Sequence, residues 1–161
     1  ERILAFRDIG RIDPIDYVEP WEIVLKNAIS IEQKNKDEYY KENLTDLQYD
    51  VTRKSATERP FTGEFWDEKR DGEYTCICCG HTLFTSEMKF DSGCGWPSFH
   101  SEHTEANINQ IQDMTHGMIR LEVQCSKCNA HLGHIFNDGP IQFGGERYCI
   151  NSASMSFEER E

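Results

Sequence analysis

The sequence predicts a mainly β domain of antiparallel strands, preceded by a small helical N-terminal part. Residues 118–124 and 146–152 alternate between apolar and polar side chains, which is the period of a strand with one buried face. From about residue 73 the pattern changes from helical to extended, and glycines and the turn signal Asn137-Asp138-Gly139-Pro140 punctuate the second half. Short alternating strands separated by turns are typical of an antiparallel β protein.

Two helices are predicted in the N-terminal part. Pro20 suits the first position of a helix whose apolar residues run to Ile29. The polar stretch 32–43 reads either as a continuation of that helix or as a linker. Thr45 offers an N-cap, and Gln48 three residues later completes a capping box for a second, short helix.

The same change in pattern suggests the domain boundary. We expect residues 1–43 to be an N-terminal extension or linker, partly helical, and residues 44–161 to form one domain. Residues 1–19 mix charged residues and isoleucine around Pro14 with no sustained period. Because Glu1 is not an initiator methionine, we expect the chain to be processed, trimmed or cut from a longer polypeptide.

The strand at 118–124 has two distinct faces. Ile119, Leu121 and Val123 share one face, while Arg120 and Glu122 share the other. We expect the apolar face to be buried.

Charge and hydropathy exclude several partners. The chain carries 17 Lys and Arg against 29 Asp and Glu, a net charge of −12, and none of its thirds is basic. Tracking phosphates or attaching to an anionic membrane needs positive charge, so neither nucleic acid nor a membrane is expected as a partner. No apolar run approaches the roughly 20 residues that span a bilayer, and no signal peptide opens the chain. We therefore expect a cytoplasmic protein.

Seven cysteines, an odd number, cannot all pair within one chain, so some thiols must serve another purpose. Cys76 and Cys79 form one C-x-x-C hook, and Cys125 and Cys128 form a second. Two hooks can present four thiolates to one tetrahedral ion, which describes a closed, structural Zn²⁺ site.

The residues after the hooks support this interpretation. Gly80 and Asn129 tolerate the left-handed conformation that turns backbone amides back toward the sulfurs. A redox-active C-x-x-C and four unconnected buried thiols are the alternatives, but two hooks in an intracellular-looking chain favour zinc.

Cys149 is the candidate nucleophile. On the strand 146–152 it shares a face with Arg147 and Asn151, about 7 Å away on each side, and these two residue types are seldom buried. A positive charge and an amide beside a thiol favour the thiolate, which is the reactive form. The alternative is a small buried residue, since free cysteine is often buried.

Cys94 lies between Gly93 and Gly95, which predicts a mobile, exposed tip. A thiol there suits a resolving role, in which it attacks an oxidised partner cysteine to form a disulfide; the alternative is a plain turn. Trp96 next to Pro97 gives a rigid apolar wall suited to a methyl or thioether group, unless it packs as an ordinary core residue. Cys78 has no visible role, and we expect it to be buried and inert.

His131 and His134 are three residues apart before a turn. With Cys125 and Cys128 they form a possible two-Cys, two-His cluster, but such a cluster on one short segment needs a helix, which Gly133 argues against. The histidines are then free to donate or shuttle a proton near neutral pH, although each alone is more often a structural residue.

Three long segments resemble methionine-R-sulfoxide reductases of the B type. They are Phe90-Asp91-Ser92-Gly93-Cys94-Gly95-Trp96-Pro97-Ser98-Phe99, His131-Leu132-Gly133-His134-Ile135-Phe136-Asn137-Asp138-Gly139-Pro140 and Arg147-Tyr148-Cys149-Ile150-Asn151-Ser152. The two C-x-x-C hooks match the zinc-containing members, and Leu44-Thr45 through Glu58-Arg59-Pro60-Phe61-Thr62-Gly63 resembles the family's entry helix. The resemblance runs from about residue 44 to 157 and leaves residues 1–43 uncovered. Because some members are fused behind an A-type reductase, the extension is open to interpretation as a remnant of such a fusion.

The resemblance implies a fold of two antiparallel β-sheets flanked by short helices, of the Mss4-like or β-tent type. One structural Zn²⁺ per chain would lie remote from the active site, held by Cys76, Cys79, Cys125 and Cys128.

The resemblance also implies a reaction. Cys149 would attack the sulfoxide sulfur while His131 and His134 orient or protonate the oxygen, so that methionine leaves and Cys149 becomes a sulfenic acid. Cys94 would then form a disulfide with Cys149, which thioredoxin reduces. The substrate would be methionine-(R)-sulfoxide, free or in oxidised proteins, and the reaction would repair oxidised methionine.

The remaining implied site residues surround the substrate. Asn151 would hydrogen-bond within the site, Trp96 would hold the ε-methyl group, and Arg147 would belong to the substrate-binding set. Two rival functions are a non-catalytic zinc-bearing β module that binds a protein and a thiol peroxidase.

Overall fold

The computed structural model describes residues 20–161. The chain divides into two compact units, with the boundary in the sequence between Tyr39 and Tyr40. Helix α1 runs over Pro20–Asn43, so the polar stretch 32–43 continues the helix that begins at Pro20. The expectations for residues 1–19 lie outside the described residues. The domain boundary at residue 43 stays a prediction.

Helix α2, Asp46–Lys54, begins with the predicted capping box. The Gln48 amide donates to Thr45 Oγ1 at 3.3 Å, and the Thr45 amide donates to Gln48 Oε1 at 3.0 Å. Val51 and Thr52 are buried on the face that packs against the strand carrying the two histidines. The cap therefore fixes the start of a helix that covers one side of the site.

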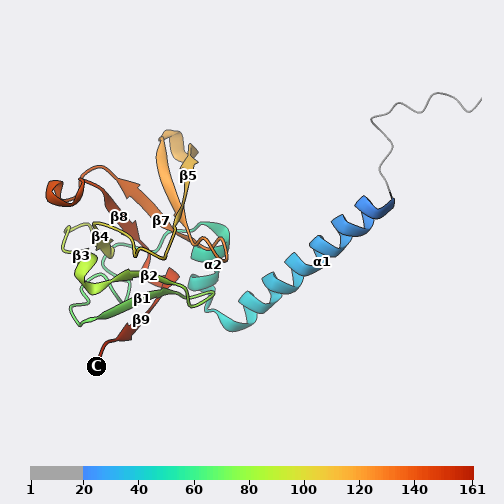
Figure 1. Ribbon diagram of the computed structural model, residues 1–161, viewed down its shortest axis with the longest axis horizontal. Helices are drawn as coiled ribbons and strands as arrows, with labels where there is room; N and C mark the ends of the chain where they lie inside the picture. Colours follow the sequence, from blue (N-terminus) through green and yellow to red (C-terminus); the bar gives the residue numbers. More distant parts are fainter. Residues whose placement is uncertain (1–19) are drawn as a thin grey trace, which may run out of the picture. The chain divides into compact units, whose positions relative to one another are not determined.

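In residues 20–161, nine strands form two antiparallel sheets, which confirms the predicted fold class (Figure 1). The smaller sheet has the order β2-β1-β9, with β1 Gly72–Cys76, β2 Thr82–Thr85 and β9 Met155–Glu159. The larger sheet has the order β3-β4-β8-β7-β6-β5, with β3 Lys89–Phe90, β4 Ser98–Phe99, β5 Asn109–Asp113, β6 Arg120–Gln124, β7 His131–Phe136 and β8 Arg147–Ile150. In the same described residues, four single-turn 3₁₀ helices connect successive strands along the chain: η1 Ser86–Met88, η2 Thr115–Gly117, η3 Ile141–Phe143 and η4 Ser152–Ser154.

Aromatic side chains from both sheets form the core. Phe84 of the smaller sheet stacks on Phe99 of the larger one with ring centroids 4.2 Å apart, and Tyr74 meets Phe99 edge-on at 5.1 Å. All three are fully buried. Each fully buried aromatic of this size contributes about 1.5–3 kcal/mol relative to exposure, so this cluster is a main contact between the sheets.

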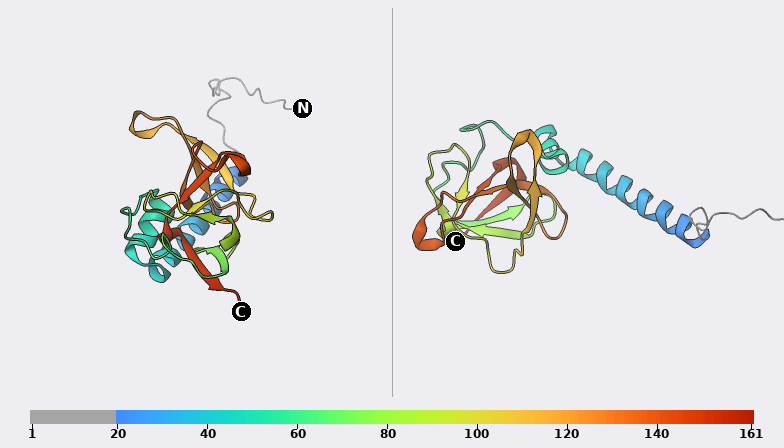
Figure 2. Two further views of the ribbon diagram at one scale, coloured as in Figure 1. Left: turned by 90° about the vertical axis from the view of Figure 1, so that its left-hand side faces the viewer. Right: turned by 90° about the horizontal axis from the view of Figure 1, so that it is seen from above.

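Strand β6 departs from the predicted burial pattern. Val123 is buried, but Leu121 is 40% exposed and Ile119 is 75% exposed, so the expectation of a buried apolar face is wrong for these two residues. These side chains are exposed because strands β5 and β6 form a hairpin that projects beyond the rest of the domain, where no second layer among the described residues covers them (Figures 1 and 2). Arg120 and Glu122 lie on the other face of β6, which is the face of the sheet that also carries His134 and Cys149.

Candidate active site and metal centre

Four cysteine sulfurs form a compact cluster. The Sγ atoms of Cys76, Cys79, Cys125 and Cys128 all lie within 4.8 Å of one another. The Cys76–Cys128 and Cys79–Cys125 sulfur pairs are each separated by 3.6 Å. Sulfurs bound tetrahedrally at about 2.3 Å from one ion lie about 3.8 Å apart, whereas a disulfide bond is about 2.0 Å long. The spacing therefore fits a shared metal ion and not paired disulfides.

The two hooks have the same backbone geometry. Gly80 and Asn129 have φ of 71° and 57°, which confirms the predicted left-handed conformation. Their amides donate to the carbonyls of Cys76 and Cys125 at 2.8 and 2.9 Å. Since Cys76 ends β1 and Cys125 follows β6, the cluster connects the two sheets.

The other predictions around the cluster have mixed outcomes. The rival two-Cys, two-His grouping is excluded for the described residues, because His131 and His134 lie on strand β7 outside the cluster. Cys78 is half-buried against the core and not fully buried as expected.

Cys94 and Cys149 bring their sulfurs to 4.0 Å from each other. Cys149 lies on β8 and Cys94 in the loop between β3 and β4, and both are half-buried. The arrangement can close to a disulfide after a displacement of about 2 Å, because the bond itself is about 2.0 Å long.

Arg147 is placed differently from the sequence expectation. Its side chain was expected on an exposed face beside Cys149, yet Arg147 is 8% exposed and Asn151 is 3% exposed. The Arg147 guanidinium donates to both carboxylate oxygens of Asp138, at 2.8 and 3.0 Å, and lies 4.7 Å over the Phe136 ring. Its NH1 group reaches Cys94 Sγ at 3.5 Å. The turn carrying Asp138 folds back over the strand and supplies the partner that burial requires.

The two thiols have different acidities. Burial raises the pKa of Cys149 to about 12, and the nearby Cys94 adds to this, while Arg147 acts in the opposite direction. The expectation that its neighbours make Cys149 a thiolate is therefore wrong for this state of the protein. Burial also disfavours the Cys94 thiolate, but hydrogen bonds from Ser92 and Ser98 outweigh it and place the pKa of Cys94 below its usual value.

The loop that carries Cys94 is exposed on one side only. Gly93 is exposed, as predicted, but Gly95 is buried, so the expected exposed tip is wrong there. Gly95 has φ of +88°, its carbonyl accepts from the Phe61 amide at 2.7 Å, and an added Cβ would lie 2.8 Å from the Phe61 ring. Both the left-handed backbone and the close ring require glycine.

A pocket of about 140 Å³ opens above Cys149. Cavities of about 150 Å³ hold a molecule the size of benzene, so this pocket has room for one side chain. Among the predicted site residues, Trp96, His134, Cys149 and Asn151 line it; Cys94, His131 and Arg147 do not. Arg120 and Phe136 also contribute to the walls.

Each histidine pairs with a carboxylate on the neighbouring hairpin. His131 Nδ1 lies 2.6 Å from Glu122 Oε1, and His134 Nε2 lies 2.8 Å from Asp113 Oδ2. Since an ionised carboxylate only accepts, these nitrogens carry the protons. Burial lowers the pKa of His131, with Glu122 opposing. His131 is buried, and its Nε2 atom has no hydrogen-bond partner among the described residues, so His134 is the histidine that can meet a ligand.

Glu58 is a buried residue that connects two walls of the pocket and that sequence reasoning left without a role. Its carboxylate accepts from the amides of Ser152 at 2.6 Å and Ala153 at 2.9 Å. Its own amide donates to Asn151 Oδ1 at 3.0 Å, and its carbonyl accepts from Trp96 Nε1 at 3.1 Å. Asn151 is held further by donation from Nδ2 to the Leu132 carbonyl at 2.9 Å, which fixes its orientation.

Asp113, Glu122 and Asp138 were also missed as site residues. In the sequence, Glu122 is a polar residue on an amphipathic strand and Asp138 is part of a turn signal. Hydrogen bonds from Thr115 and His134, with the charge of Arg120, hold the pKa of Asp113 well below its usual range. Only the pairing of distant segments reveals these roles, so no local pattern identifies them.

Comparison with known proteins identifies the family. The SelR domain family matches residues 44–159, and the chain belongs to it. Curated relatives carry the name peptide methionine sulfoxide reductase MsrB, in agreement with the resemblance of the three sequence segments. The Hahella chejuensis protein is 56% identical over 80% of this chain and 91% of its own length. The Cellvibrio japonicus protein is 49% identical over 83% and 94% of the two chains, and that of Escherichia coli K12 is 52% identical over 77% and 90%.

Two further findings concern the structure as a whole. A solved structure, the Mis18 "Yippee-like" domain, matches with a TM-score of 0.45 at 13% identity, over 57% of this chain and 99% of that chain.

Across residues 20–161, every helix is too short or too polar to cross a membrane.

Proposed function

We propose that this chain reduces the R epimer of methionine sulfoxide, free or within proteins, to methionine. Its place in the SelR family beside MsrB relatives makes it a methionine sulfoxide reductase of the B type. The single observation that supports the residue assignment is that Cys149 lines a side-chain-sized pocket while the Cys94 sulfur lies 4.0 Å away. A thiol beside a pocket and a second thiol within reach are what a sulfenic acid followed by a disulfide requires.

The reaction balances without an outside proton in its first half. The Cys149 sulfur attacks the sulfoxide sulfur, the S–O bond breaks, and the oxygen ends on Cys149 as a sulfenic acid while methionine leaves. Because the pKa of Cys149 is about 12, the free thiol carries its proton at neutral pH. This proton ends on the transferred oxygen, which becomes the hydroxyl group of the sulfenic acid. His134, which lines the pocket, is placed to relay the proton. The buried His131 ring lies 5.5 Å from the His134 ring, behind the pocket wall.

The second half regenerates the thiols. Cys94, the more acidic of the two, attacks the Cys149 sulfur and releases water as the disulfide forms. Arg147 contacts the Cys94 sulfur, and its charge favours the Cys94 thiolate. The role of Arg147 in substrate binding stays a prediction. A dithiol reductant, for which we propose thioredoxin, then returns both cysteines to the reduced state.

The pocket walls have positioning and binding roles. Trp96 supplies an apolar surface for the methyl group of the substrate. Asn151 bonds to two backbone groups and so holds the wall in place.

We further propose that Cys76, Cys79, Cys125 and Cys128 hold one structural Zn²⁺ per chain. The four-sulfur donor set and its spacing support zinc, and none of the four cysteines is among the residues that line the pocket. The ion would stabilise the junction of the two sheets and take no part in the chemistry.

Two variants of the full, metal-loaded chain test the assignment with separated R and S sulfoxide epimers. Cys149→Ser is expected to abolish reduction of the R epimer with dithiothreitol. Cys94→Ser is expected to release one methionine per chain and then stop with thioredoxin. Turnover by Cys149→Ser, a preference for the S epimer, or equal reduction of peroxide would contradict the proposal.

A further inference from the structure

Strand β8, which carries Cys149, belongs to the same sheet as β5 and β6, whose hairpin projects from the domain (Figures 1 and 2). Cross-strand pairing places Cys149 opposite His134, His134 opposite Glu122, and Glu122 opposite Ile111. Directly opposed residues in an antiparallel sheet point to the same side. Ile111 therefore lies on the pocket's face, and it is 45% exposed on the edge strand.

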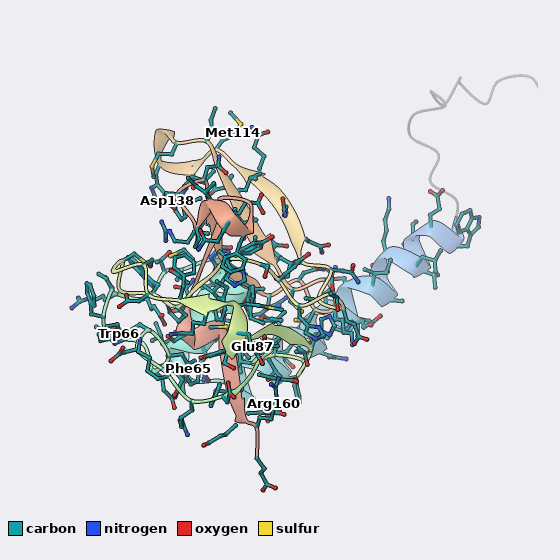
Figure 3. All side chains as sticks on the ribbon, turned by 60° about the vertical axis from the view of Figure 1, so that its left-hand side comes forward. Phe65, Trp66, Glu87, Met114, Asp138 and Arg160 are labelled. Carbon is teal, nitrogen blue, oxygen red and sulfur yellow. The ribbon has the colours of Figure 1, made fainter. Side chains whose placement is uncertain are left out.

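Further apolar side chains surround the polar residues of this hairpin. Arg120 lines the pocket and pairs with Asp113 at 2.8 Å. In the connection between β5 and β6, Met118 is 48% exposed and Met114 is 67% exposed, with Met114 at the far end of the hairpin (Figure 3). We call Ile111, Met114 and Met118 the hairpin surface. Ile111 and the pocket-lining residue Arg120 lie on the same face of the sheet, so a polypeptide that leaves the pocket across this face meets Ile111.

The size of the pocket indicates what covers this surface. A volume of about 140 Å³ admits one side chain, so the polypeptide that carries this side chain must lie outside. Three strand spacings of about 4.8 Å separate β8 from β5, a distance of about 14 Å. An extended polypeptide covers this distance in about four residues at about 3.4 Å each.

The charge of the protein and of this surface indicates which polypeptide segments can bind there. The chain as a whole has a net charge of −12, which disfavours an acidic partner. At the hairpin the ion pair of Asp113 and Arg120 is internally neutralised, and the adjoining side chains are apolar. An apolar segment of an unfolded chain matches this surface, because folded proteins bury such segments.

We propose that the hairpin surface binds the polypeptide that flanks an oxidised methionine, through an apolar residue about four positions from it. This inference rests on the proposed function and adds a source of specificity to it. The surface makes the enzyme favour a methionine sulfoxide that has an apolar residue about four positions away, because a polar residue there, or the free amino acid, lacks the apolar contact with Ile111.

The test compares substrates on matched variants of the full, metal-loaded chain. The substrates are free methionine-R-sulfoxide and nine-residue peptides with the R-sulfoxide at the centre, carrying leucine or serine four positions to either side. The test variant is the double substitution Ile111→Ser and Met118→Ser. Leu121→Ser is the matched control, because Leu121 is an exposed apolar residue of the same hairpin that pairs with Ile135 on the opposite face.

The ratio of kcat/KM for the leucine peptide to that for the free sulfoxide is the readout. This ratio is expected to fall about tenfold in the double variant, because the leucine side chain of the peptide is no longer buried against apolar residues. It is expected to stay within twofold in Leu121→Ser. The unaltered enzyme is expected to prefer the leucine peptide to the serine peptide. Unchanged thermal unfolding would show that the variants are folded.

Other outcomes overturn the proposal. An unchanged ratio in the double variant, or an equal fall in the control, would refute the hairpin surface while leaving the reductase activity intact. A dimer of the unaltered protein in sedimentation that disappears in the double variant would show that a second copy covers the surface. Failure of the unaltered protein to reduce any R-sulfoxide contradicts the proposed function itself.

Discussion

The sulfur of Cys94 lies 4.0 Å from the sulfur of Cys149, although the two residues are 55 positions apart in the sequence. Ser98, which pairs with Cys149 across β4 and β8, also lies 3.4 Å from the Cys94 sulfur. Ser92, whose hydroxyl oxygen lies 2.7 Å from that of Ser98, donates to the same sulfur at 3.0 Å. The second thiol is thus held beside the first by short polar contacts, and an approach of about 2 Å completes a disulfide.

Alkylation should distinguish the two thiols by acidity. At pH 7 we expect iodoacetamide to modify Cys94 before Cys149, because the pKa of Cys149 is raised to about 12 and that of Cys94 is lowered. A raised pKa leaves little thiolate below it, so the rate at Cys149 should increase about tenfold per pH unit between pH 7 and 10. Mass spectrometry of the reduced, metal-loaded protein measures both rates. Faster labelling of Cys149 at pH 7 would contradict the burial effect.

Glu58 should be important to both stability and catalysis. Glu58→Ala leaves the buried amides of Ser152 and Ala153 without an acceptor, so we expect the free energy of unfolding to fall by about 2–4 kcal/mol. Glu58→Gln keeps an acceptor oxygen and should lose less. Urea unfolding measures the stabilities, and equal values for both variants would show that the carboxylate's hydrogen bonds contribute little.

The contact between Asp138 and Arg147 should affect recycling and leave the first step intact. Asp138→Asn weakens the pairing that holds the guanidinium against Cys94, so we expect disulfide formation to slow while the initial release of methionine stays unchanged. The free energy of unfolding should fall by about 1–2 kcal/mol, since Asp138 itself is largely exposed. Rapid-quench measurement of the two steps separates them.

The neighbouring Glu146→Gln serves as control for that experiment, because Glu146 is exposed. A slower release of methionine in Asp138→Asn would assign Arg147 to substrate binding, as the sequence analysis expected.

Removal of the metal should destabilise the whole domain. The four sulfurs join the end of β1 to the residues after β6, so chelation is expected to lower the unfolding temperature sharply and to leave little folded protein. Metal analysis of the purified protein should give one Zn²⁺ per chain. A clear deficit of zinc in fully folded protein would refute the structural role of the four cysteines.

Local patterns predicted the features that depend on neighbours in sequence. The capping box of Thr45 and Gln48 and the left-handed Gly80 and Asn129 depend on a few consecutive residues, and all are present. The four cysteines come from two such local hooks, and their convergence was predicted because four thiolates would complete the coordination of one tetrahedral ion.

Features that depend on burial could not be inferred in this way. Arg147 looks exposed in the sequence because nothing local shows that Asp138 returns to pair with it. The acidity of Cys149 follows from how deeply the strand is covered, and not from the residues beside it. Glu58 acts largely through backbone groups more than 30 positions away, which no residue pattern records.

The exposed thioethers on the hairpin make the enzyme subject to the damage that it reverses. Met114 and Met118 face solvent, whereas Met155 is 2% exposed and protected. Oxidation would convert the two side chains to polar sulfoxides, which weakens an apolar surface. Under the proposed function, a copy that carries the R sulfoxide at either position becomes a substrate for an intact copy, whereas the S sulfoxide needs a different enzyme. The population therefore reverses only the R part of this damage, and copies that keep the S epimer retain a polar hairpin surface.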